Sequence, residues 1–364
     1  MRVDVVDPSA FTPPYDHALC AALARAGVDV SLQTSRFAYG PVPAGEGYRV
    51  VERFYRREIG RPGSRARLAA KLAQHVPDML RYRRAAAAAD LVHFQWLTVQ
   101  PLDLYLLPQR RPLVLTAHDV LPREPRPGQR SAQQRLYDRV DAVVVHSEHG
   151  RERLALELGV PRSKLRVIPH GAFDHLTHQT DERPLPDELA AVTGPVVLCF
   201  GLIRPYKGID VLLEAWDGIS GAELWIVGMP RMDTAPLRAA APPGVRFVER
   251  FITDPEIPAF FRRADLVVLP YREIDQSGVL FTALAFGRPL LLSAVGGFPE
   301  VAAHGAAELV APGDAGQLHA ALAGLAADPQ RRAALGAAAA AAAAGEYSWD
   351  RIAARTVELY RTLI

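Results

Sequence analysis

Two basic side chains stand close together in the segment FGLIRPYKGIDV, residues 200–211. Arg204 and Lys207 lie just before Gly208, where the pattern predicts that a helix begins. The free N–H groups at the start of a helix favour anions, and a lysine with an arginine beside them suits a diphosphate. Gly201 would let the backbone turn away from the preceding strand. The segment therefore predicts a site for a phosphorylated ligand.

A pair of solvated charges on a surface turn is the competing interpretation, and the composition weighs against it. The chain has 42 lysines and arginines together, yet lysine stands only at positions 71, 164 and 207. A GC-rich coding sequence explains the general preference for arginine. A lysine inside a motif is then an exception, which makes Lys207 the first residue to test.

A second loop, QSGVL at 276–280, precedes another predicted helix. Ser277, Gly278 and Val279 would offer backbone N–H groups at the start of that helix. Two helix starts aimed at one anion make a stronger phosphate site than either alone. Serine is also a favoured N-cap residue, and the two roles are compatible.

A third loop, AVGGFPE at 294–300, places Glu300 after a glycine pair that permits close approach of the backbone. The Glu300 carboxylate could accept hydrogen bonds from ribose or sugar hydroxyls, and solvated helix capping is the alternative. In the first half of the chain, His118 and Asp119 end the predicted strand in LTAHDV. A histidine there could hydrogen-bond to a sugar hydroxyl or could be a satisfied structural residue.

The elements that would position these residues are short apolar strands that alternate with helical stretches, which favours parallel sheets built from βαβ units. One series of strands is predicted at 2–7, 28–34, 89–96, 112–119, 141–147 and 165–171, and a second at 196–201, 222–228, 245–251, 264–270, 288–297 and 307–313. This pattern predicts an α/β protein with two Rossmann-type domains. Because parallel sheets bind ligands at the carboxyl ends of their strands, we expect the site in a cleft between the domains.

The predicted organisation has four parts. Residues 1–175 form an N-terminal, acceptor-side domain, and the polar, proline-bearing segment 176–195 forms a linker. Residues 196–345 form the C-terminal domain that carries the phosphate-site loops. The amphipathic segment 346–364 is expected to be a terminal helix that packs back on the N-terminal domain.

The composition excludes several classes of protein. A net charge of +2 gives no support for a nucleic-acid binder, and two distant cysteines give neither a disulfide framework nor a zinc site. The apolar run at the N-terminus is too short for a signal peptide or a membrane span, so a cytoplasmic location is expected.

The stretch 53–84 holds ten basic side chains against Glu58 and Asp78. Leu68, Leu72 and Val76 recur at intervals of four, as on one helical face. The favoured interpretation is a solvated basic face over an apolar side that packs on the core. The alternative is a peripheral contact with anionic lipid at the inner membrane face, or with an acidic acceptor.

Taken together, these motifs resemble the retaining, nucleotide-sugar-dependent glycosyltransferases of the GT-B fold, known as glycosyltransferase family 4 or "glycosyl transferases group 1". The resemblance runs from the THD-like strand end at 116–119, through VIPHG (167–171) and GLIRPYKG (201–208), to SGVLFTALAFGRPLL (277–291) and VGGFPE (295–300). It also includes the terminal segment 347–363.

The resemblance implies a nucleoside-diphosphate sugar as donor, a hydroxyl acceptor such as a glycan, glycolipid or small metabolite, and neither cofactor nor metal. By this resemblance Lys207 and Arg204 bind the donor diphosphate, and the backbone of residues 277–279 contacts the phosphates and sugar. His118 then hydrogen-bonds to the donor sugar at the reaction centre, and Glu300 is a donor-binding residue.

The chain departs from the family pattern at three places. Ile274 and Thr282 stand where two glutamates are common, and Glu273 or Asp275 could replace them. Leu202 stands where an arginine is usual, and the segment TPPYDHAL at 12–19 replaces a glycine pair after the first strand.

Three other functions compete with sugar transfer. A non-catalytic two-domain sugar-binding protein would use the same cleft. A GT-B epimerase or phosphorylase would share the fold, but a phosphorylase would require inorganic phosphate and release a sugar phosphate. A dinucleotide oxidoreductase is disfavoured, because neither half has GxGxxG after its first strand.

Overall fold

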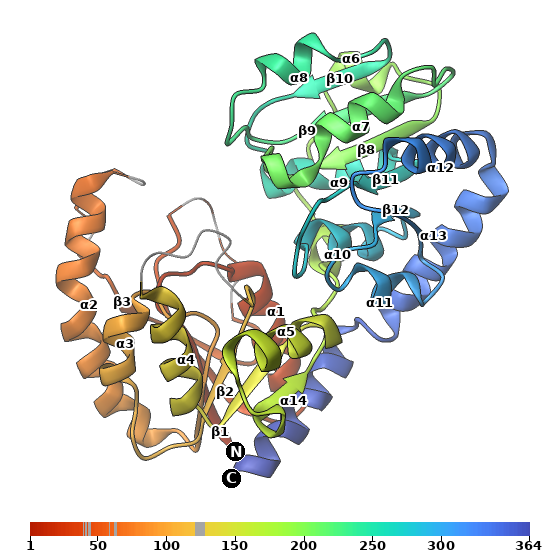
Figure 1. Cartoon of the computed structure of the whole chain (residues 1–364). Helices are drawn as coiled ribbons and strands as arrows, with labels where there is room; N and C mark the ends of the chain where they lie inside the picture. The colour runs from red at the N-terminus through yellow and green to blue at the C-terminus, as the bar shows by residue number, and fades with distance from the viewer. Residues whose placement is uncertain (39, 41, 43–44, 58, 62–63, 121–127) are drawn as a thin grey trace. The chain divides into compact units, whose positions relative to one another are not determined.

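The structure, a computed structural model, describes residues 1–38, 40, 42, 45–57, 59–61, 64–120 and 128–364 (Figure 1). These residues form two compact units. Unit 1 comprises residues 1–169 together with 349–364, and unit 2 comprises residues 170–348. Unit 2 is therefore inserted in the sequence of unit 1, and the last 16 residues of the chain belong to unit 1.

Unit 1 is built on a parallel sheet with the strand order β3-β2-β1-β4-β5-β6-β7. Its strands are β1 (Arg2–Asp7), β2 (Asp29–Ser35), β3 (Arg49–Phe54), β4 (Leu91–Phe94), β5 (Leu113–Thr116), β6 (Ala142–Val145) and β7 (Leu165–Val167). Apolar side chains on both faces of the central strands are buried, as is typical of parallel sheets covered by helices on each side. Each strand predicted for this half is present.

Strand β3 was not predicted. Its sequence RVVERF is half charged, and only Phe54 in it is buried. It lies at the edge of the sheet beside β2, where solvent on one side makes charged side chains acceptable. In so polar a segment, alternation alone does not distinguish an edge strand from a loop.

The helices that cover this sheet come from both ends of the chain. They are α1 (Pro13–Arg25), α2 (Arg65–Ala85), α3 (Gln100–Leu106), α4 (Gln129–Arg139), α5 (Glu148–Leu158) and α14 (Trp349–Leu363). Helix α1 begins with two prolines, whose fixed φ suits a first turn. The turn after α1 uses Gly27 at φ +84°, a backbone conformation that glycine adopts readily.

The last helix, α14, completes the core of unit 1. Its apolar face, which includes Trp349 and Ile352, is buried against α1 and the sheet. The hydroxyl oxygen of Tyr360 lies 2.6 Å from Nδ1 of His93, and Nε2 of His93 lies 2.8 Å from Oγ1 of Thr116. This buried polar chain joins α14 to β4 and β5. Burial lowers the pKa of His93 to about 3, so the ring is neutral.

The neutral ring of His93 makes the stability of unit 1 depend on pH. A histidine in an unfolded chain has a pKa of about 6.5, whereas folded His93 has a pKa of about 3. Between about pH 3 and pH 6.5 this histidine is therefore protonated in the unfolded chain but not in the folded protein. The free energy of unfolding therefore falls as the pH falls below about 6.5. We expect chemical denaturation to show that wild type loses about 2 kcal/mol more than His93→Gln between pH 7 and pH 5.

The comparison with His93→Gln is needed because another buried group of unit 1 titrates with the opposite sign. Burial raises the pKa of Asp16, so its contribution to stability is lost as the pH rises from its unfolded value toward its folded one. Asp16 is present in both proteins and cancels in the difference. Equal losses in the two proteins would contradict the assignment to His93.

Unit 2 is built on a second parallel sheet, with the order β10-β9-β8-β11-β12-β13. Its strands are β8 (Val196–Phe200), β9 (Glu223–Val227), β10 (Val245–Val248), β11 (Leu266–Leu269), β12 (Leu290–Ser293) and β13 (Ala307–Val310). Its helices are α6 (Asp187–Ala190), α7 (Ile209–Trp216), α8 (Ala235–Ala239), α9 (Ile257–Arg263), α10 (Gly278–Ala285), α11 (Phe298–Ala302), α12 (Ala315–Ala327) and α13 (Pro329–Ala344). Helices α7 and α12 pack over one face, and α9, α10 and α13 over the other. Each strand predicted for this half is present.

The predicted linker over 176–195 differs from the observed division of the chain. The short helix η3 (Asp174–His178) and helix α6 belong to unit 2, where Leu176 and Leu189 are buried in its core. The backbone N–H of Arg183 donates to the carbonyl of Pro255. Two isolated apolar residues in a polar, proline-bearing segment produce no hydrophobic periodicity, so the sequence does not predict this packing.

Candidate functional site

Three loops meet at the carboxyl edge of the unit 2 sheet. They follow β8, β11 and β12, which are neighbours in the sheet. The strand order reverses between β8 and β11, and such a switch point is where open parallel sheets bind ligands. All three loops were singled out in the sequence, and the fold brings them together.

Lys207 lies beneath the first of these loops. Its side chain is 5% exposed, and Nζ donates to the carbonyl of Phe200 at 3.2 Å. Nζ also lies 4.9 Å from the centre of the Tyr271 ring, within reach of a cation–π interaction. A Cβ atom on Gly201, which has φ +102°, would stand 2.7 Å from Nζ. Lys207 is thus a fixed cation, and Gly201 leaves room for it.

Arg204 lies in a different environment. It is exposed and precedes the short helix η4 (Pro205–Lys207), whereas Lys207 ends that helix and is buried. Helix α7 then begins after Gly208, where the sequence predicted a helix start. The two cations predicted as a pair therefore differ in exposure, which the spacing alone could not show.

Close backbone contacts tie the three loops to one another. Gly208 has φ +65°, and a Cβ atom on it would overlap the carbonyl oxygen of Pro270. A Cβ atom on Gly296 would overlap the carbonyl oxygen of Ile274. Arg272 donates to both carboxylate oxygens of Asp210, at 2.8 and 2.5 Å. The edge of the sheet is therefore one connected layer of loops.

Replacement of Gly208 by alanine is expected to destabilise unit 2 by about 3 kcal/mol or more, because strain at positive φ adds to the overlap with Pro270. Gly218→Ala is the matched control in the same unit. Gly218 has a similar φ of +81°, but no atom of the described residues lies within 4 Å of a Cβ placed there. Its cost should stay near about 1–2 kcal/mol. If denaturant melts gave the same loss of unfolding free energy for Gly208→Ala and Gly218→Ala, the backbone would have moved to relieve the overlap with Pro270, and the prediction would be wrong.

Helix α10 begins at the second loop, as predicted. Ser277 occupies its N-cap position and is buried, but its side chain makes no capping hydrogen bond. Gly278 is exposed at the first helical position. Val279 lies close to the first loop, with a methyl group 3.1 Å from a Cβ placed on Gly201. The helix start and the Lys207 loop thus lie side by side.

The acidic residues of these loops differ in how deeply they are buried. Glu300 is half-buried in the first turn of the short helix α11, which follows the third loop. Glu273 is exposed and Asp275 is half-buried, and the Asp275 carbonyl accepts from the backbone N–H of Gly297. Thr282 donates to the carbonyl of Gly278 inside α10, at 2.9 Å.

In unit 1, His118 lies in a cluster of rings just after β5. Its ring stacks on Trp96 with 5.0 Å between centroids, and Tyr15 meets it edge-on at 4.8 Å. Its Nε2 lies 3.1 Å from Oε1 of Gln95, and its Nδ1 lies 3.2 Å from Nε2 of His146. The order of the strands could have revealed Gln95 and Trp96, because they directly follow β4, the neighbour of β5.

The hydrogen bonds of this cluster constrain its protons. Nδ1 of His146 faces the carbonyl of Ile168 at 3.0 Å and must donate to it. Burial lowers the pKa of His146 to about 4, so the ring is neutral and its Nε2 accepts from His118. Nε2 of a neutral His118 is then an acceptor. The amide nitrogen of Gln95 is buried without a partner among the described residues, and exchange of its two amide atoms would let it donate to Nε2.

The loop after β1 is held by carboxylates where the family pattern has a glycine pair. Asp7 is fully buried and accepts from the backbone N–H groups of Ser9, Phe11 and Thr12, at 3.1, 2.5 and 3.2 Å. Burial and the neighbouring Asp7 raise the pKa of Asp16 well above its usual value. The replacement segment therefore has its own way of fixing the turn. Asp119, by contrast, is exposed.

The favoured interpretation of the basic stretch 53–84, in which its apolar side packs on the core, is wrong for helix α2. Leu68, Leu72 and Val76 do not face the core; they are 61%, 48% and 36% exposed. Instead, the buried residues of α2 are His75, Asp78, Met79 and Tyr82. Polar side chains can be buried here because they are paired, as His75 is with Asp103 at 2.7 Å. Glu58 lies outside the described residues.

Within the described ranges, no helix has the length and apolarity needed to cross a bilayer, and no three His, Cys, Asp or Glu side chains gather as a metal ion would require.

Comparison with known proteins bears on both units. The family model "Glycosyltransferase Family 4" matches residues 15–172, and "Glycosyl transferases group 1" matches residues 194–328. A GDP-mannose-dependent alpha-(1-6)-phosphatidylinositol monomannoside mannosyltransferase from Mycobacterium tuberculosis is 31% identical over 261 residues, which cover 65% of this chain and 65% of the relative. The chain thus matches slightly less than two thirds of that relative's length.

Two solved structures share the fold along the whole chain. Sucrose-phosphate synthase from Thermosynechococcus elongatus is 21% identical with a TM-score of 0.76, and the match covers 100% of this chain and 99% of that one. Anabaena HepE in complex with UDP-glucose is 21% identical with a TM-score of 0.73, with complete coverage of both chains. The chain combines a glycosyltransferase family 4 domain with a glycosyl transferases group 1 domain, and its two parallel-sheet units have the GT-B fold.

Proposed function

We propose that this chain is an enzyme, a retaining, metal-independent glycosyltransferase that moves a sugar from a nucleoside-diphosphate sugar to a hydroxyl acceptor. The observation that carries the proposal is the meeting of three strand-end loops around the buried cation of Lys207. A fixed cation beside the start of helix α10 suits a diphosphate, because the partial positive charge of the helix start adds to that of the ammonium group.

In the proposed reaction the bond between the sugar and the diphosphate breaks, and negative charge builds on the leaving phosphate oxygens. Lys207 and the N–H groups at residues 277–279 stabilise that charge without having to move. Arg204, which is exposed, adds to the positive potential at the rim. Glu300 accepts hydrogen bonds from donor hydroxyls, with Asp275 or Glu273 in support.

His118 is proposed to hydrogen-bond to the donor sugar as it becomes oxocarbenium-like. Its ring is held by Trp96, Tyr15 and His146, so little reorganisation is needed. The acceptor hydroxyl attacks the face that the diphosphate leaves, and the departing phosphate takes its proton. This same-face course retains the configuration of the anomeric carbon.

The donor's base and sugar are open to a direct screen. The names of the relatives mention GDP-mannose in one case and UDP-glucose in another, so both belong in the panel. A thermal-shift screen of nucleoside diphosphates and their sugars should raise the melting temperature for the correct donor, since a ligand that binds only the folded state stabilises it. Release of the diphosphate with EDTA present, and NMR of the product anomer, then test metal independence and retention. A product of inverted configuration would reject the proposed course.

We also propose that α2 contacts the surface of an anionic membrane. Leu68, Leu72, Val76 and Leu80 form an exposed apolar stripe on a helix rich in arginine. Leu68→Ser with Leu72→Ser is expected to lower co-sedimentation with phosphatidylglycerol vesicles by more than about tenfold, because each leucine contributes about 1.5–3 kcal/mol when fully buried. Leu156→Ser is the control, since Leu156 is 77% exposed on α5. Unchanged sedimentation of the α2 variant would reject the contact.

A further inference from the structure

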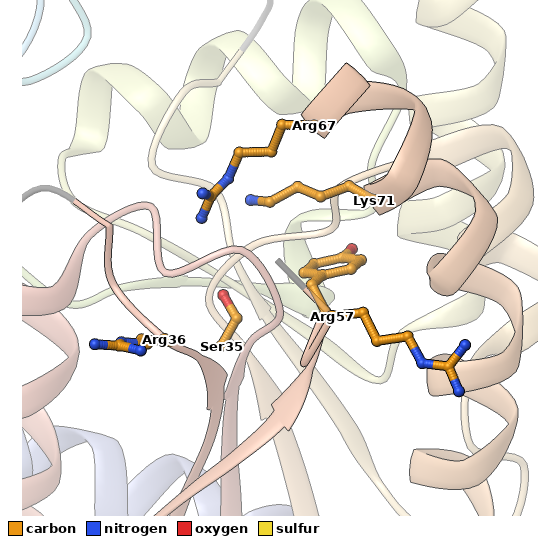
Figure 2. Close-up of a pocket in the computed structure, with 6 residues that line it drawn as sticks. Ser35, Arg36, Arg57, Arg67 and Lys71 are labelled. Carbon is orange, nitrogen blue, oxygen red and sulfur yellow. The ribbon is translucent and has the colours of Figure 1, made fainter. Parts of the chain in front are cut away.

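A small basic pocket in unit 1 is lined by none of the residues proposed to bind the donor (Figure 2). The described residues that line it are Ser35, Arg36, Tyr55, Arg57, Arg67 and Lys71. They come from the carboxyl end of β2, from the segment after β3 and from the first turns of α2. Four of these six carry a positive charge and none is acidic. The pocket therefore lies at the ligand-binding edge of the sheet and has the charge for an anion.

Arg67 and Lys71 form its centre. They stand four residues apart on α2, which places them on one face of the helix. Figure 2 shows both side chains reaching from α2 toward Ser35, whereas the guanidinium groups of Arg36 and Arg57 point outward. Two cations thus define the pocket, and two more raise the positive potential at its rim.

Ser35 adds a buried hydroxyl. It is 5% exposed, and its Oγ has no hydrogen-bond partner among the described residues. Figure 2 shows the hydroxyl directed toward the side chains of Arg67 and Lys71. A buried hydroxyl without a partner is unfavourable, and an oxygen of a bound ligand would satisfy it. The Ser35 hydroxyl is therefore the observation that points to a ligand.

Tyr55 fixes one wall of the pocket. Its φ of +50° is rare for a bulky residue, and its hydroxyl lies 2.7 Å from Nδ1 of the buried His75. Nε2 of His75 in turn lies 2.7 Å from the carboxylate of Asp103. Nζ of Lys71 lies 5.1 Å from the centre of the Tyr55 ring. A strained backbone and a buried hydrogen-bond relay thus hold the ring that positions Lys71, as is typical of binding sites.

The chemistry of the lining side chains favours a tetrahedral oxyanion. An arginine can bind two oxygens, a lysine is a compact charge, and a serine hydroxyl can donate to a third oxygen. The pocket is small and opens to solvent, so the rest of a larger ligand can lie outside it. The pocket suits one charged group of a larger ligand.

We propose that this pocket binds a phosphate group of the acceptor. The inference rests on the proposed transferase function and names its acceptor class, a hydroxyl compound that also carries a phosphate. A soluble sugar phosphate and a phospholipid headgroup both offer this chemistry.

Calorimetric titration with inorganic phosphate tests the pocket. The variant Arg67→Ala with Lys71→Ala is expected to bind phosphate more than about tenfold more weakly than wild type, and Ser35→Ala several-fold more weakly. Arg65→Ala removes the same charge from the same helix outside the pocket and should bind as wild type. Wild-type binding by the double variant, with unchanged circular dichroism, would overturn the proposal, as would an equal loss in Arg65→Ala.

Two further measurements separate this proposal from the transferase function and identify the source of the phosphate. Lys207→Ala should bind a nucleoside diphosphate more weakly than wild type but keep this phosphate site, and the Arg67→Ala, Lys71→Ala variant should do the reverse. Loss of phosphate binding in Lys207→Ala alone would overturn the pocket. Phosphatidylglycerol vesicles and glucose 6-phosphate then serve as competing probes. Displacement of inorganic phosphate by vesicles assigns a lipid headgroup, and displacement by glucose 6-phosphate assigns a soluble acceptor. If neither displaces it, the pocket does not accept a phosphate ester and the proposal fails.

Discussion

Replacement of Lys207 by methionine is expected to lower the rate of sugar transfer by roughly 10²–10³-fold, the usual cost of removing one preorganised group that stabilises charge in a transition state. Methionine keeps most of the length of the side chain and its contact with Tyr271, so unit 2 should remain folded. The loss should be largest in kcat, measured at saturating donor, because the phosphate charge grows as the bond to the sugar breaks.

Lys164→Met is the matched control for this variant. The ammonium group of Lys164 donates to the carbonyls of Tyr137, Asp138 and Val140 in unit 1, so it has a purely structural set of partners. Its loss should lower the melting temperature without a comparable fall in kcat. Wild-type turnover in Lys207→Met, with the donor bound normally, would remove the central residue of the proposed function.

Replacement of His118 by alanine is expected to lower transfer by about 100-fold or more while the affinity for the nucleoside diphosphate stays unchanged. The two readouts should separate because Lys207 and the loops of unit 2 are proposed to bind the diphosphate, whereas His118 is proposed to contact the sugar. Measurement of kcat together with the dissociation constant of the diphosphate checks both.

His93→Gln provides the comparison for His118→Ala. His93 is buried in the same sheet with its partners Tyr360 and Thr116, so its replacement should affect stability more than turnover. If His118→Ala lowered stability and turnover in the same proportion as His93→Gln, then the role of His118 would be structural. A parallel fall in diphosphate affinity would lead to the same conclusion.

The fold could be predicted from the sequence wherever burial leaves a compositional trace. Interior strands such as β6 and β11 are runs of Val, Leu and Ala, because both faces of a covered parallel sheet are apolar. The edge strand β3 and the packed segment around Leu176 leave no such trace. Charged residues are tolerated at an edge, and isolated apolar anchors do not form a period.

The candidate site was predictable to the level of loops but not of side chains. Residues that follow neighbouring parallel strands must lie at one edge, so the meeting of the loops with Gly208, Ser277 and Gly296 could be foreseen. The burial of Lys207 against the exposure of Arg204 could not, since it depends on the course of η4. The exposure of the apolar stripe on α2 could not be predicted either, because helical periodicity identifies a face without showing what covers it.

The return of the chain through α14 has consequences for biosynthesis. The backbone N–H of Ala172 donates to the carbonyl of Tyr347 at 2.8 Å, so the chain enters and leaves unit 2 at one point. Unit 2 is thus a self-contained insertion that can fold as soon as it is synthesised, whereas unit 1 must wait for α14 to supply Trp349, Ile352 and Tyr360. Until then the nascent N-terminal half exposes an unfinished apolar surface. A protein cut after residue 348 should therefore need chaperones or aggregate, while residues 170–348 alone should not.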